Sequence, residues 1–292
     1  MPPDDVRALL ARAVQRLKEA GCGTPDLDAR LLFQAATGLS REDIILDSGR
    51  TIPAGEIGQF EAAIMRRMER EPVSRILGER EFYGRCFRVT PATLDPRPDT
   101  ETLVEAALAL MPAKARLLDL GTGTGAIAVT LLAERPDATA VATDLSQEAL
   151  GVARENAERA GVAQRLHLIH GSWFAPVTAV FDIIVSNPPY IPSGDIAGLS
   201  PDVRNFDPAL ALAGGDDGLD PYRAIAPHAA SHLAAEGHVL VEIGAGQAEQ
   251  VEAIFAASGF SMVERHEDLG GHVRCLAFRR PSGQPEKITI GK

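Results

Sequence analysis

Two patterns of hydrophobic and polar residues divide the chain. Up to about residue 70, apolar side chains recur three and four positions apart, which predicts short amphipathic helices. The first begins near Val6 and stops before Gly21, and the later ones lie in "TPDLDARLLFQAATG", "SREDIIL" and "AGEIGQFEAAIMRRMERE". Ser40 and Asp43 have the spacing of a capping box. We expect a small helical domain over residues 1–71.

The helical pattern ends at Pro72. "REFYGRCFRVT" contains two β-prone runs around Gly84 and Arg85, which predicts a hairpin. The following "TPATLDPRPDTE" is rich in proline, which favours extended connecting chain. Residues 72–99 are therefore interpreted as a β-hairpin and linker.

After Thr100, β-prone and helical segments alternate nearly to the end of the chain, as in an α/β fold. The predicted strands are Arg116–Leu120, Thr139–Thr143, Leu166–His170, Phe181–Val185, His238–Ile243, Ser261–Arg265 and His272–Phe278. The predicted helices are Ala126–Glu134, Ser146–Ala160, Pro221–Leu233 and Gln247–Ala257. The last two strands are separated only by "HEDLGG", which is too short for a crossover helix, so they should pair antiparallel. We assign residues 100–280 to this domain and 281–292 to a polar tail.

Composition and charge narrow the function classes. The formal net charge of -11 argues against a mainly basic, phosphate-binding protein, and the acidic excess lies entirely beyond residue 88. The three cysteines are far apart, which is typical of free thiols. The N-terminus carries acids where a signal peptide needs cations, and no apolar run approaches ~18 residues. We expect a cytoplasmic protein without a membrane partner, and the scattered histidines suggest no metal site.

"LLDLGTGTGAIAV" is a strand, a glycine-rich turn and the start of a helix. Gly121, Gly123 and Gly125 would let the backbone pass close to a ligand. Asp144 follows the next strand, 19 positions after Gly125, where a carboxylate can accept from both ribose hydroxyls. The pattern indicates a nucleotide-type cofactor, but it also satisfies the dinucleotide fingerprint, so NAD remains open.

"SNPPY" follows the strand Phe181–Val185 and should lie beside the glycine turn, because ligands bind at the carboxyl ends of such strands. The Asn187 side-chain oxygen and the Pro188 carbonyl can accept the two N–H groups of a planar NH₂ group. Consecutive prolines fix the backbone, and Tyr190 can cover the planar group. This combination indicates methyl transfer to an amide or amine nitrogen.

These motifs carry a family resemblance. "NPPY" with "DLGTGTGAIA" resembles class I S-adenosylmethionine-dependent methyltransferases that act on planar NH₂ groups. More narrowly, "EPVSRILGEREFYG", "PRPDTE", "GGDDGL" and "LVEIGAGQ" are similar, in order, to segments of the PrmC/HemK family. The resemblance covers nearly the whole chain. It implies a Rossmann-like domain with an N-terminal helical domain, and methylation of the glutamine N5 atom in the Gly-Gly-Gln motif of peptide chain release factors.

The resemblance also implies residue roles. Asp144 would hold the ribose hydroxyls, Trp173 would lie against the adenine, and Asn187 would contact both cofactor and glutamine. The glycine turn that would line the cofactor comprises Gly121, Thr122, Gly123, Thr124 and Gly125, and the glutamine pocket comprises Asn187, Pro188, Pro189 and Tyr190. Ser172 and Asp95 depart from the family pattern, which leaves a contact to the adenine amino group open.

Three other functions remain possible. A nucleic-acid methyltransferase acting on adenine N6 or guanine N2 could use the same Asn-Pro-Pro-Tyr device, but it should carry a basic recognition region. An NAD-dependent oxidoreductase would leave that device unexplained, as would a non-catalytic cofactor-binding module. We therefore expect a release factor as protein partner and no stable nucleic-acid partner.

Other charged residues are interpreted as structural. "PDTE", with Asp99 and Glu101, is typical of a helix start, and Arg97 precedes it. Arg66, Arg67 and Arg70 are predicted to form a solvated helix face.

Overall fold

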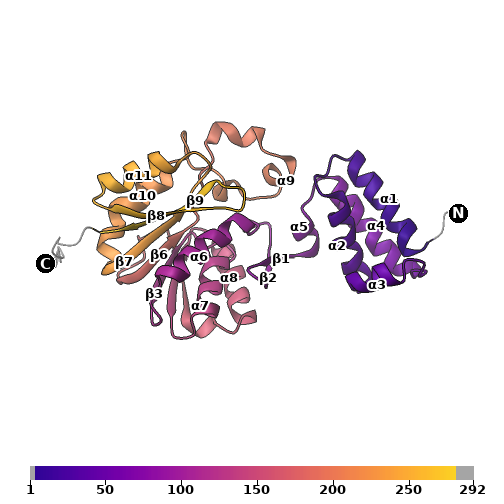
Figure 1. Cartoon of the computed structure of the whole chain (residues 1–292), viewed down its shortest axis with the longest axis horizontal. Coiled ribbons are helices and arrows are strands. Elements are labelled where there is room, and N and C mark those ends of the chain that lie inside the picture. Colours follow the sequence, from indigo (N-terminus) through magenta and orange to yellow (C-terminus); the bar gives the residue numbers. More distant parts are fainter. Residues whose placement is uncertain (1–3, 281–292) are drawn as a thin grey trace. The chain divides into compact units, whose positions relative to one another are not determined.

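A computed structural model describes residues 4–280 of the chain. The chain forms two compact units, of which one contains the residues up to Glu79 together with Ser200–Phe206, and the other contains the rest (Figure 1). The predicted polar tail, 281–292, lies outside the described residues. No helix in the described part is long and apolar enough to cross a bilayer.

The first unit is helical, as predicted. Its helices are α1 (Val6–Glu19), α2 (Pro25–Thr37), α3 (Arg41–Leu46), α4 (Ala54–Met68), α5 (Val73–Leu77) and the short α9 (Pro201–Arg204). The apolar side chains of α1 to α5 meet in one core, where Phe33 and Phe60 pack edge to face with ring centroids 5.1 Å apart. Ser40 and Asp43 form the predicted capping box. Helix α5 lies where the sequence predicted only hairpin and linker.

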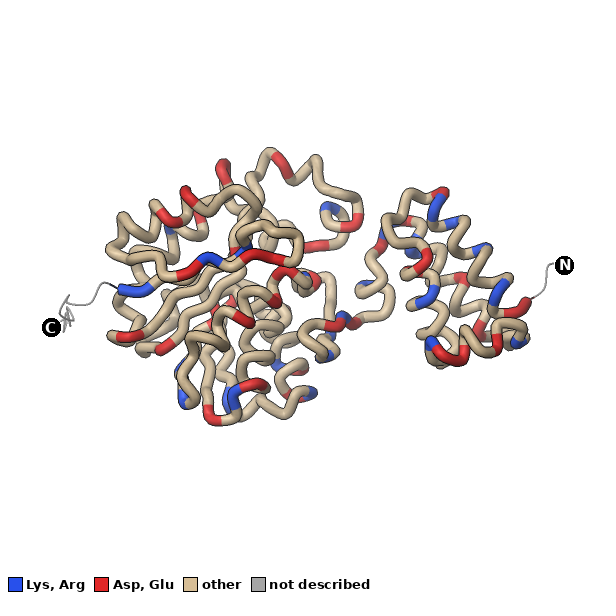
Figure 2. Tube along the Cα trace, in the orientation of Figure 1, with Lys and Arg blue, Asp and Glu red and all other residues tan. Residues whose placement is uncertain are grey.

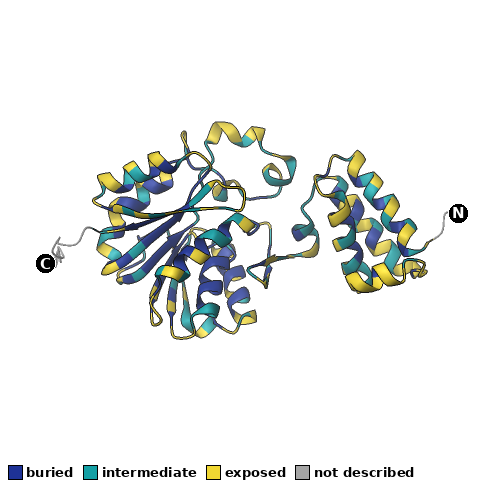
Figure 3. Ribbon diagram, in the orientation of Figure 1, coloured by how far each residue is buried: buried dark blue, intermediate teal, exposed yellow. Residues whose placement is uncertain are grey.

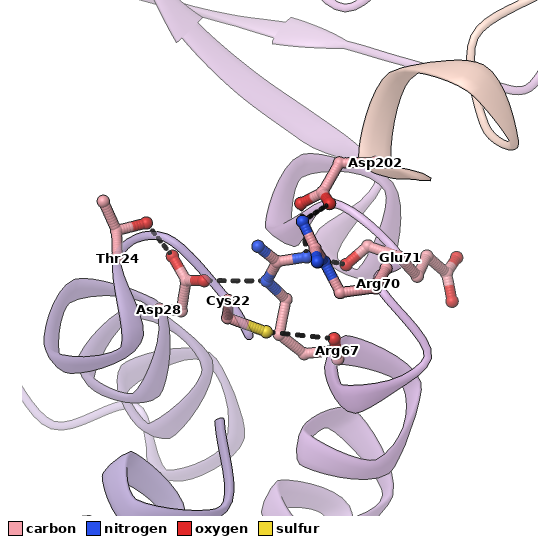
Figure 4. A network of polar contacts seen from close by, with 7 residues as sticks. All are labelled: Cys22, Thr24, Asp28, Arg67, Arg70, Glu71 and Asp202. Atoms are coloured by element: carbon pink, nitrogen blue, oxygen red, sulfur yellow. Dashed lines mark hydrogen bonds and ion pairs between the residues drawn. The ribbon is translucent and has the colours of Figure 1, made fainter. Parts of the chain in front are cut away.

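The prediction that Arg67 faces solvent is wrong. Its side chain is about 6% exposed and forms ion pairs with Asp28 at 2.7 Å and with Asp202 at 2.8 Å (Figure 4). Arg70 pairs with the other oxygen of Asp202. Arg66 does face solvent and pairs with Glu71. Because Asp202 is far away in sequence, the spacing of basic residues on α4 did not reveal this network.

The predicted hairpin is present, with strands β1 (Glu79–Phe82) and β2 (Arg85–Arg88). Its two turn residues, Tyr83 and Gly84, have φ values of 50° and 67°, which is typical of the primed two-residue turns that match strand twist. Phe82 and Phe87 are buried in the core of the second unit.

The second unit is built on a seven-stranded sheet with the order β5-β4-β3-β6-β7-β9-β8. The strands are β3 (Arg116–Leu120), β4 (Thr139–Asp144), β5 (Leu166–His170), β6 (Phe181–Ser186), β7 (Leu233–Glu242), β8 (Ser261–Glu267) and β9 (Val273–Arg279). The first five strands in this order are parallel, and β9 is antiparallel to both of its neighbours. This confirms the predicted fold class, including the antiparallel end.

Helices cover both faces of the sheet, whose central strands are buried (Figure 3). The α-helices are α6 (Glu101–Leu110), α7 (Ala126–Glu134), α8 (Gln147–Arg159), α10 (Asp220–Ala229) and α11 (Ala248–Ala257). The 3₁₀ turns are η1 (Pro98–Thr100), η2 (Ala163–Arg165), η3 (Ser193–Gly198), η4 (Ala209–Ala211) and η5 (Ala230–His232). The helix predicted over Pro221–Leu233 ends at Ala229, because Leu233 already pairs with β6 as the first residue of β7.

The register of the sheet places three loops side by side. Leu120, the last residue of β3, is opposite Thr143 of β4 and Ser186 of β6. The loops that follow these three parallel strands therefore leave the sheet at the same edge. The loop after β3 begins with Gly121, and the loop after β6 begins with Asn187. Asp144 is the last residue of β4, directly before the third loop.

Candidate active site

A cavity of about 560 Å³ opens at this edge of the second unit. Eight of the predicted site residues line it, namely Gly121, Thr122, Gly123, Thr124, Asp144, Trp173, Asn187 and Pro189. Gly125, Pro188 and Tyr190 were also predicted as site residues but are not among the lining residues. The structure thus brings the glycine turn and the Asn-Pro-Pro-Tyr segment to one cavity.

The glycine turn is held by the neighbouring strand. The backbone N–H groups of Gly121 and Thr122 both donate to the carbonyl of Thr143. Gly121 has a φ of 73°, and a Cβ there would lie 3.5 Å from the Trp173 ring. At Gly125, a Cβ would lie 3.1 Å from the Cβ of Ala153 on α8. Gly125 therefore permits close packing of α7 on α8, whereas Gly121 keeps the cavity wall open.

Asp144 is oriented by two backbone donors. Its Oδ2 accepts from the N–H of Gly123 and its Oδ1 from the N–H of Ser146, each at 2.8 Å. A carboxylate has about four acceptor positions, so each oxygen retains one for a ligand hydroxyl. The side chain is thus fixed beside the cavity with free acceptor capacity.

Asp119 has a structural role beneath the glycine turn. It is fully buried, accepts from the Thr122 hydroxyl at 2.6 Å, and does not line the cavity. Burial raises its pKa to about 7, while the hydrogen bonds from Thr122 and from the Ala128 backbone oppose that rise. Asp119 holds the glycine turn against the first turn of α7.

Trp173 borders the cavity next to Gly121. Its backbone has a φ of 46°, which is uncommon for a bulky residue, and its carbonyl accepts from the Thr143 hydroxyl at 3.1 Å. The ring packs on the core around Phe174 on one side. Ser172 is exposed and is not a lining residue, so the structure shows no contact from it to the cavity.

The backbone of the Asn-Pro-Pro-Tyr segment packs closely against Gly214 and Gly218. A Cβ at Gly214 would be 2.8 Å from the carbonyl oxygen of Pro189, and one at Gly218 would be 2.3 Å from that of Tyr190. The Tyr190 carbonyl also accepts from Gln247 Nε2 at 3.0 Å. Only glycine fits such close backbone contacts. The "GGDDGL" loop therefore sets the position of the segment that follows Asn187.

Two residues at this site were missed by the sequence reasoning. Thr100 lines the cavity and accepts from Asn187 Nδ2 at 3.1 Å. Glu242, the last residue of β7, is 1% exposed and lies against both of them. The sequence feature that could have indicated Glu242 is an acidic residue at the end of an otherwise apolar strand, in "HVLVEIG". Its contacts come from residues that are distant in sequence.

The charged residues of "PRPDTE" each have a different partner. Arg97 lines the cavity and pairs with Asp207 at 2.5 Å. Asp99 pairs with Arg274 at 3.2 Å, and Glu101 accepts from the Tyr83 backbone N–H.

The cavity fits a sulfonium nucleoside better than a dinucleotide. Asp144 has acceptor capacity for ribose hydroxyls, and Ile127 and Leu145 add apolar wall. Arg97 is the one cation among the lining residues of the described chain, and Asp207 already pairs with it. A pyrophosphate would find little positive charge here, whereas a positively charged sulfur needs none. The residues present therefore fit S-adenosylmethionine.

Solved structures share the fold. A methyltransferase from Pyrococcus furiosus has a TM-score of 0.52 at 20% identity, over 68% of this chain and 89% of that chain. The catalytic domain of hMettl16, in complex with MAT2A 3′UTR hairpin 6, has a TM-score of 0.55 at 14% identity, over 70% and 77%. At these identities the likeness shows the fold alone.

Sequence comparisons cover both units. Residues 8–78 match the PrmC N-terminal domain family, and residues 97–197 match the methyltransferase small domain family. The release factor glutamine methyltransferase of Cereibacter sphaeroides is 50% identical over 94% of this chain and 98% of its own length. The protein of the same name from Agrobacterium fabrum is 48% identical over 94% and 97%. The chain therefore belongs to the release factor glutamine methyltransferase family.

Proposed function

We propose that this protein transfers a methyl group from S-adenosylmethionine to the side-chain amide nitrogen, N5, of the glutamine in the Gly-Gly-Gln motif of peptide chain release factors. One observation carries the proposal. Asn187 and Pro189 line the same cavity as the glycine turn and Asp144, so an acceptor nitrogen at the first pair would meet a methyl donor at the second.

S-adenosylmethionine, when bound, would supply an electrophilic methyl carbon on a positively charged sulfur, and the sulfur would be left as a neutral thioether. Gly121 to Thr124 would line its methionine and ribose, Asp144 would accept from the ribose hydroxyls, and Trp173 would lie against the adenine.

Asn187 would aim the acceptor. An amide nitrogen is a weak nucleophile because its lone pair is delocalised, so the site must hold it in line with the methyl group. Asn187 Oδ1 and the Pro188 carbonyl would accept its two N–H groups, and Pro189 would keep that backbone rigid. Positioning of this kind contributes roughly 7 kcal/mol or more in enzymes.

Tyr190 would pack behind this pocket. Burial raises its pKa to about 12, so the phenol stays neutral. Carbonyl oxygens and a neutral aromatic ring stabilise the positive charge that passes from sulfur to nitrogen. The proton leaves after transfer, so the site needs no separate general base.

The charge distribution favours a protein acceptor over a nucleic acid. Basic and acidic positions balance over residues 1–88, and the acidic excess lies in the remainder (Figure 2). A nucleic-acid methyltransferase should instead carry a basic recognition surface. We also propose that the protein acts in the cytoplasm, where release factors work.

Incubation with methyl-labelled S-adenosylmethionine and, in parallel, release factor, ribosomal RNA or DNA tests the proposal. We expect label on the release factor, and none on a factor whose Gly-Gly-Gln glutamine is replaced by alanine. Label on RNA or DNA without label on the factor would refute the assigned substrate. Label that persists on the substituted factor would mean a different acceptor atom.

The proposed role of Asn187 has its own test. The Asn187→Ala variant should lose most turnover while it still binds S-adenosylmethionine, because the cofactor keeps Asp144 and the glycine turn. Turnover close to that of the unchanged protein would exclude the role given to the Asn187 amide.

A further inference from the structure

Glu242 is a buried carboxyl next to the proposed acceptor site. It ends strand β7 and is 1% exposed. The Thr100 hydroxyl and the Asn187 amide hydrogen-bond to its carboxyl group. In the described part of the chain, its Oε2 has no hydrogen-bond partner. A carboxylate buried in this way is costly, so its presence beside Asn187 needs a reason.

The hydrogen bonds around Thr100 have a direction. A hydroxyl has one proton to donate and two lone pairs that accept. An ionised Glu242 only accepts, so Thr100 directs its proton to Glu242. Its lone pairs then face Asn187 and can only accept. The Asn187 amide must therefore present Nδ2, as observed in the 3.1 Å contact to Thr100 Oγ1.

This arrangement decides which end of the amide meets the acceptor. With Nδ2 bonded to Thr100 and Glu242, Oδ1 remains for the cavity that Asn187 borders. An oxygen there accepts from a planar NH₂ group, whereas a reversed amide would direct its own N–H groups at those of the acceptor. The two amide ends have nearly the same shape, so packing alone does not select one of them.

We propose that Glu242, through Thr100 and through its own hydrogen bond from Asn187, is a positioning residue for methyl transfer that holds Asn187 with Oδ1 toward the acceptor nitrogen. The inference rests on the proposed role of Asn187, and it extends that role to two further residues. Glu242 itself does not touch the acceptor.

Charged groups from several elements face Glu242. Burial raises its pKa to about 7, while Thr100, Arg274 and Asn187 oppose the rise and Asp99 adds to it. Tyr190 and Tyr222 lie close enough that the Glu242 charge raises the pKa of both phenols. Arg274 forms ion pairs with Asp99 and Asp268, and no ion pair joins it to Glu242 among the described residues. The Glu242 carboxyl therefore titrates near neutral pH, and in its ionised form it accepts the hydrogen bond from the Thr100 hydroxyl.

The test compares Glu242→Leu, which removes the acceptor, with Glu242→Gln, which retains an oxygen for Thr100. Methylation of the release factor is measured across pH, with both substrates saturating to obtain kcat and with S-adenosylmethionine varied to obtain its KM. We expect Glu242→Leu to lower kcat ~10-fold or more, since aim is lost, with the KM for S-adenosylmethionine nearly unchanged. Glu242→Gln should retain most of kcat. If kcat of the unchanged protein changes with pH near 7, that change should be absent in Glu242→Gln, because glutamine does not titrate.

A matched control removes another buried polar atom. Thr130 on α7 is fully buried, and its Oγ1 has no hydrogen-bond partner among the described residues. Thr130→Val should leave kcat unchanged. If Glu242→Leu is folded and its kcat lies within about threefold of the unchanged protein, the inference fails. It also fails if Glu242→Gln loses as much as Glu242→Leu.

A double variant tests the route through Asn187. In an Asn187→Ala background, Glu242→Leu should lower the residual single-turnover rate little further, because its effect acts through the missing amide. An equal further loss would overturn the inference. If the acceptor assignment is wrong, the unchanged protein will not label the release factor. If only this inference is wrong, the unchanged protein will label the factor, and the Glu242 variants will label it at a similar rate.

Discussion

Arg67 Nη1 and Asp202 Oδ2 form a partly buried ion pair of 2.8 Å within the helical unit, although Asp202 belongs to a segment that follows the Asn-Pro-Pro-Tyr motif in sequence. The chain thus leaves the second unit after Leu199 and returns to it at Asp207. Pro208 and Leu210, which follow this excursion, line the cavity.

Replacement of Arg67 by methionine should destabilise the helical unit. The change leaves Asp28 buried without its cation and removes one of the two cations that Asp202 meets. Breaking a buried pair in this way costs about 3 kcal/mol or more. Urea unfolding measures the loss. Arg66→Met is the matched control, because its exposed pair with Glu71 contributes about 1 kcal/mol at most. Equal losses for the two variants would contradict the buried network.

Gly218→Ala should impair catalysis through the backbone of the motif. The added Cβ would lie 2.3 Å from the Tyr190 carbonyl oxygen, so that segment must shift. We expect kcat/KM to fall ~10-fold or more, because small misplacements at a reacting centre are costly. Initial-rate kinetics with release factor measure it.

Gly259→Ala is the control for backbone strain in that experiment. Its φ of 85° is similar to the 77° of Gly218, but nothing lies within 4 Å of its added Cβ. This variant should lose about 1 kcal/mol of stability and keep its activity. A comparable loss of activity in both variants would show that strain, rather than the clash with Tyr190, is responsible.

Asp144→Ala should weaken cofactor binding. The change removes the ribose acceptor and the two hydrogen bonds that order Gly123 and Ser146. Hydrogen bonds to charged groups contribute about 1.5–3 kcal/mol, so the Kd for S-adenosylmethionine should rise ~10-fold or more in calorimetry. Asp182→Ala removes a similar carboxylate-to-backbone bond, to Arg116 at the opposite edge of the sheet, and should leave that Kd unchanged. An unchanged Kd for Asp144→Ala would remove Asp144 from the ribose site.

Stability should depend on pH through Glu242. Its pKa rises from 4.5 to about 7 on folding, chiefly because of burial. Between these values the unfolded chain releases a proton that the folded protein retains, so the free energy of unfolding falls as pH rises, by up to about 1.4 kcal/mol per pH unit. Above pH 7 the contribution is constant.

The variant Glu242→Leu isolates this contribution. Its stability relative to the unchanged protein should increase between pH 4.5 and 7 and then level off, since the similar contribution of Asp119 is present in both and cancels. Denaturant unfolding at several pH values measures the difference. A difference that does not vary with pH would mean that Glu242 does not titrate in this range.

Much of the architecture follows from local sequence patterns. Strands β3 and β5 have the predicted bounds. β3 is a mostly apolar run that is buried after its first residue, whereas in β5 exposed histidines separate half-buried apolar residues. The hairpin and the antiparallel end of the sheet were also predicted, since short connections leave little choice of topology. Helix α6 was not among the predicted helices, although "PDTE" at its start is typical of a helix N-terminus.

The parts of the candidate site that are contiguous in the chain could be predicted from local sequence. The glycine turn and the Asn-Pro-Pro-Tyr segment each carry their chemistry within a few residues, and the rule that ligands bind at strand carboxyl ends brings them together. The residues that these parts contact could not be predicted in this way. Glu242 beside Thr100, Gly218 under Tyr190 and Asp202 on Arg67 are contacts between distant segments. Such contacts depend on where separate elements pack, and no local periodicity encodes that.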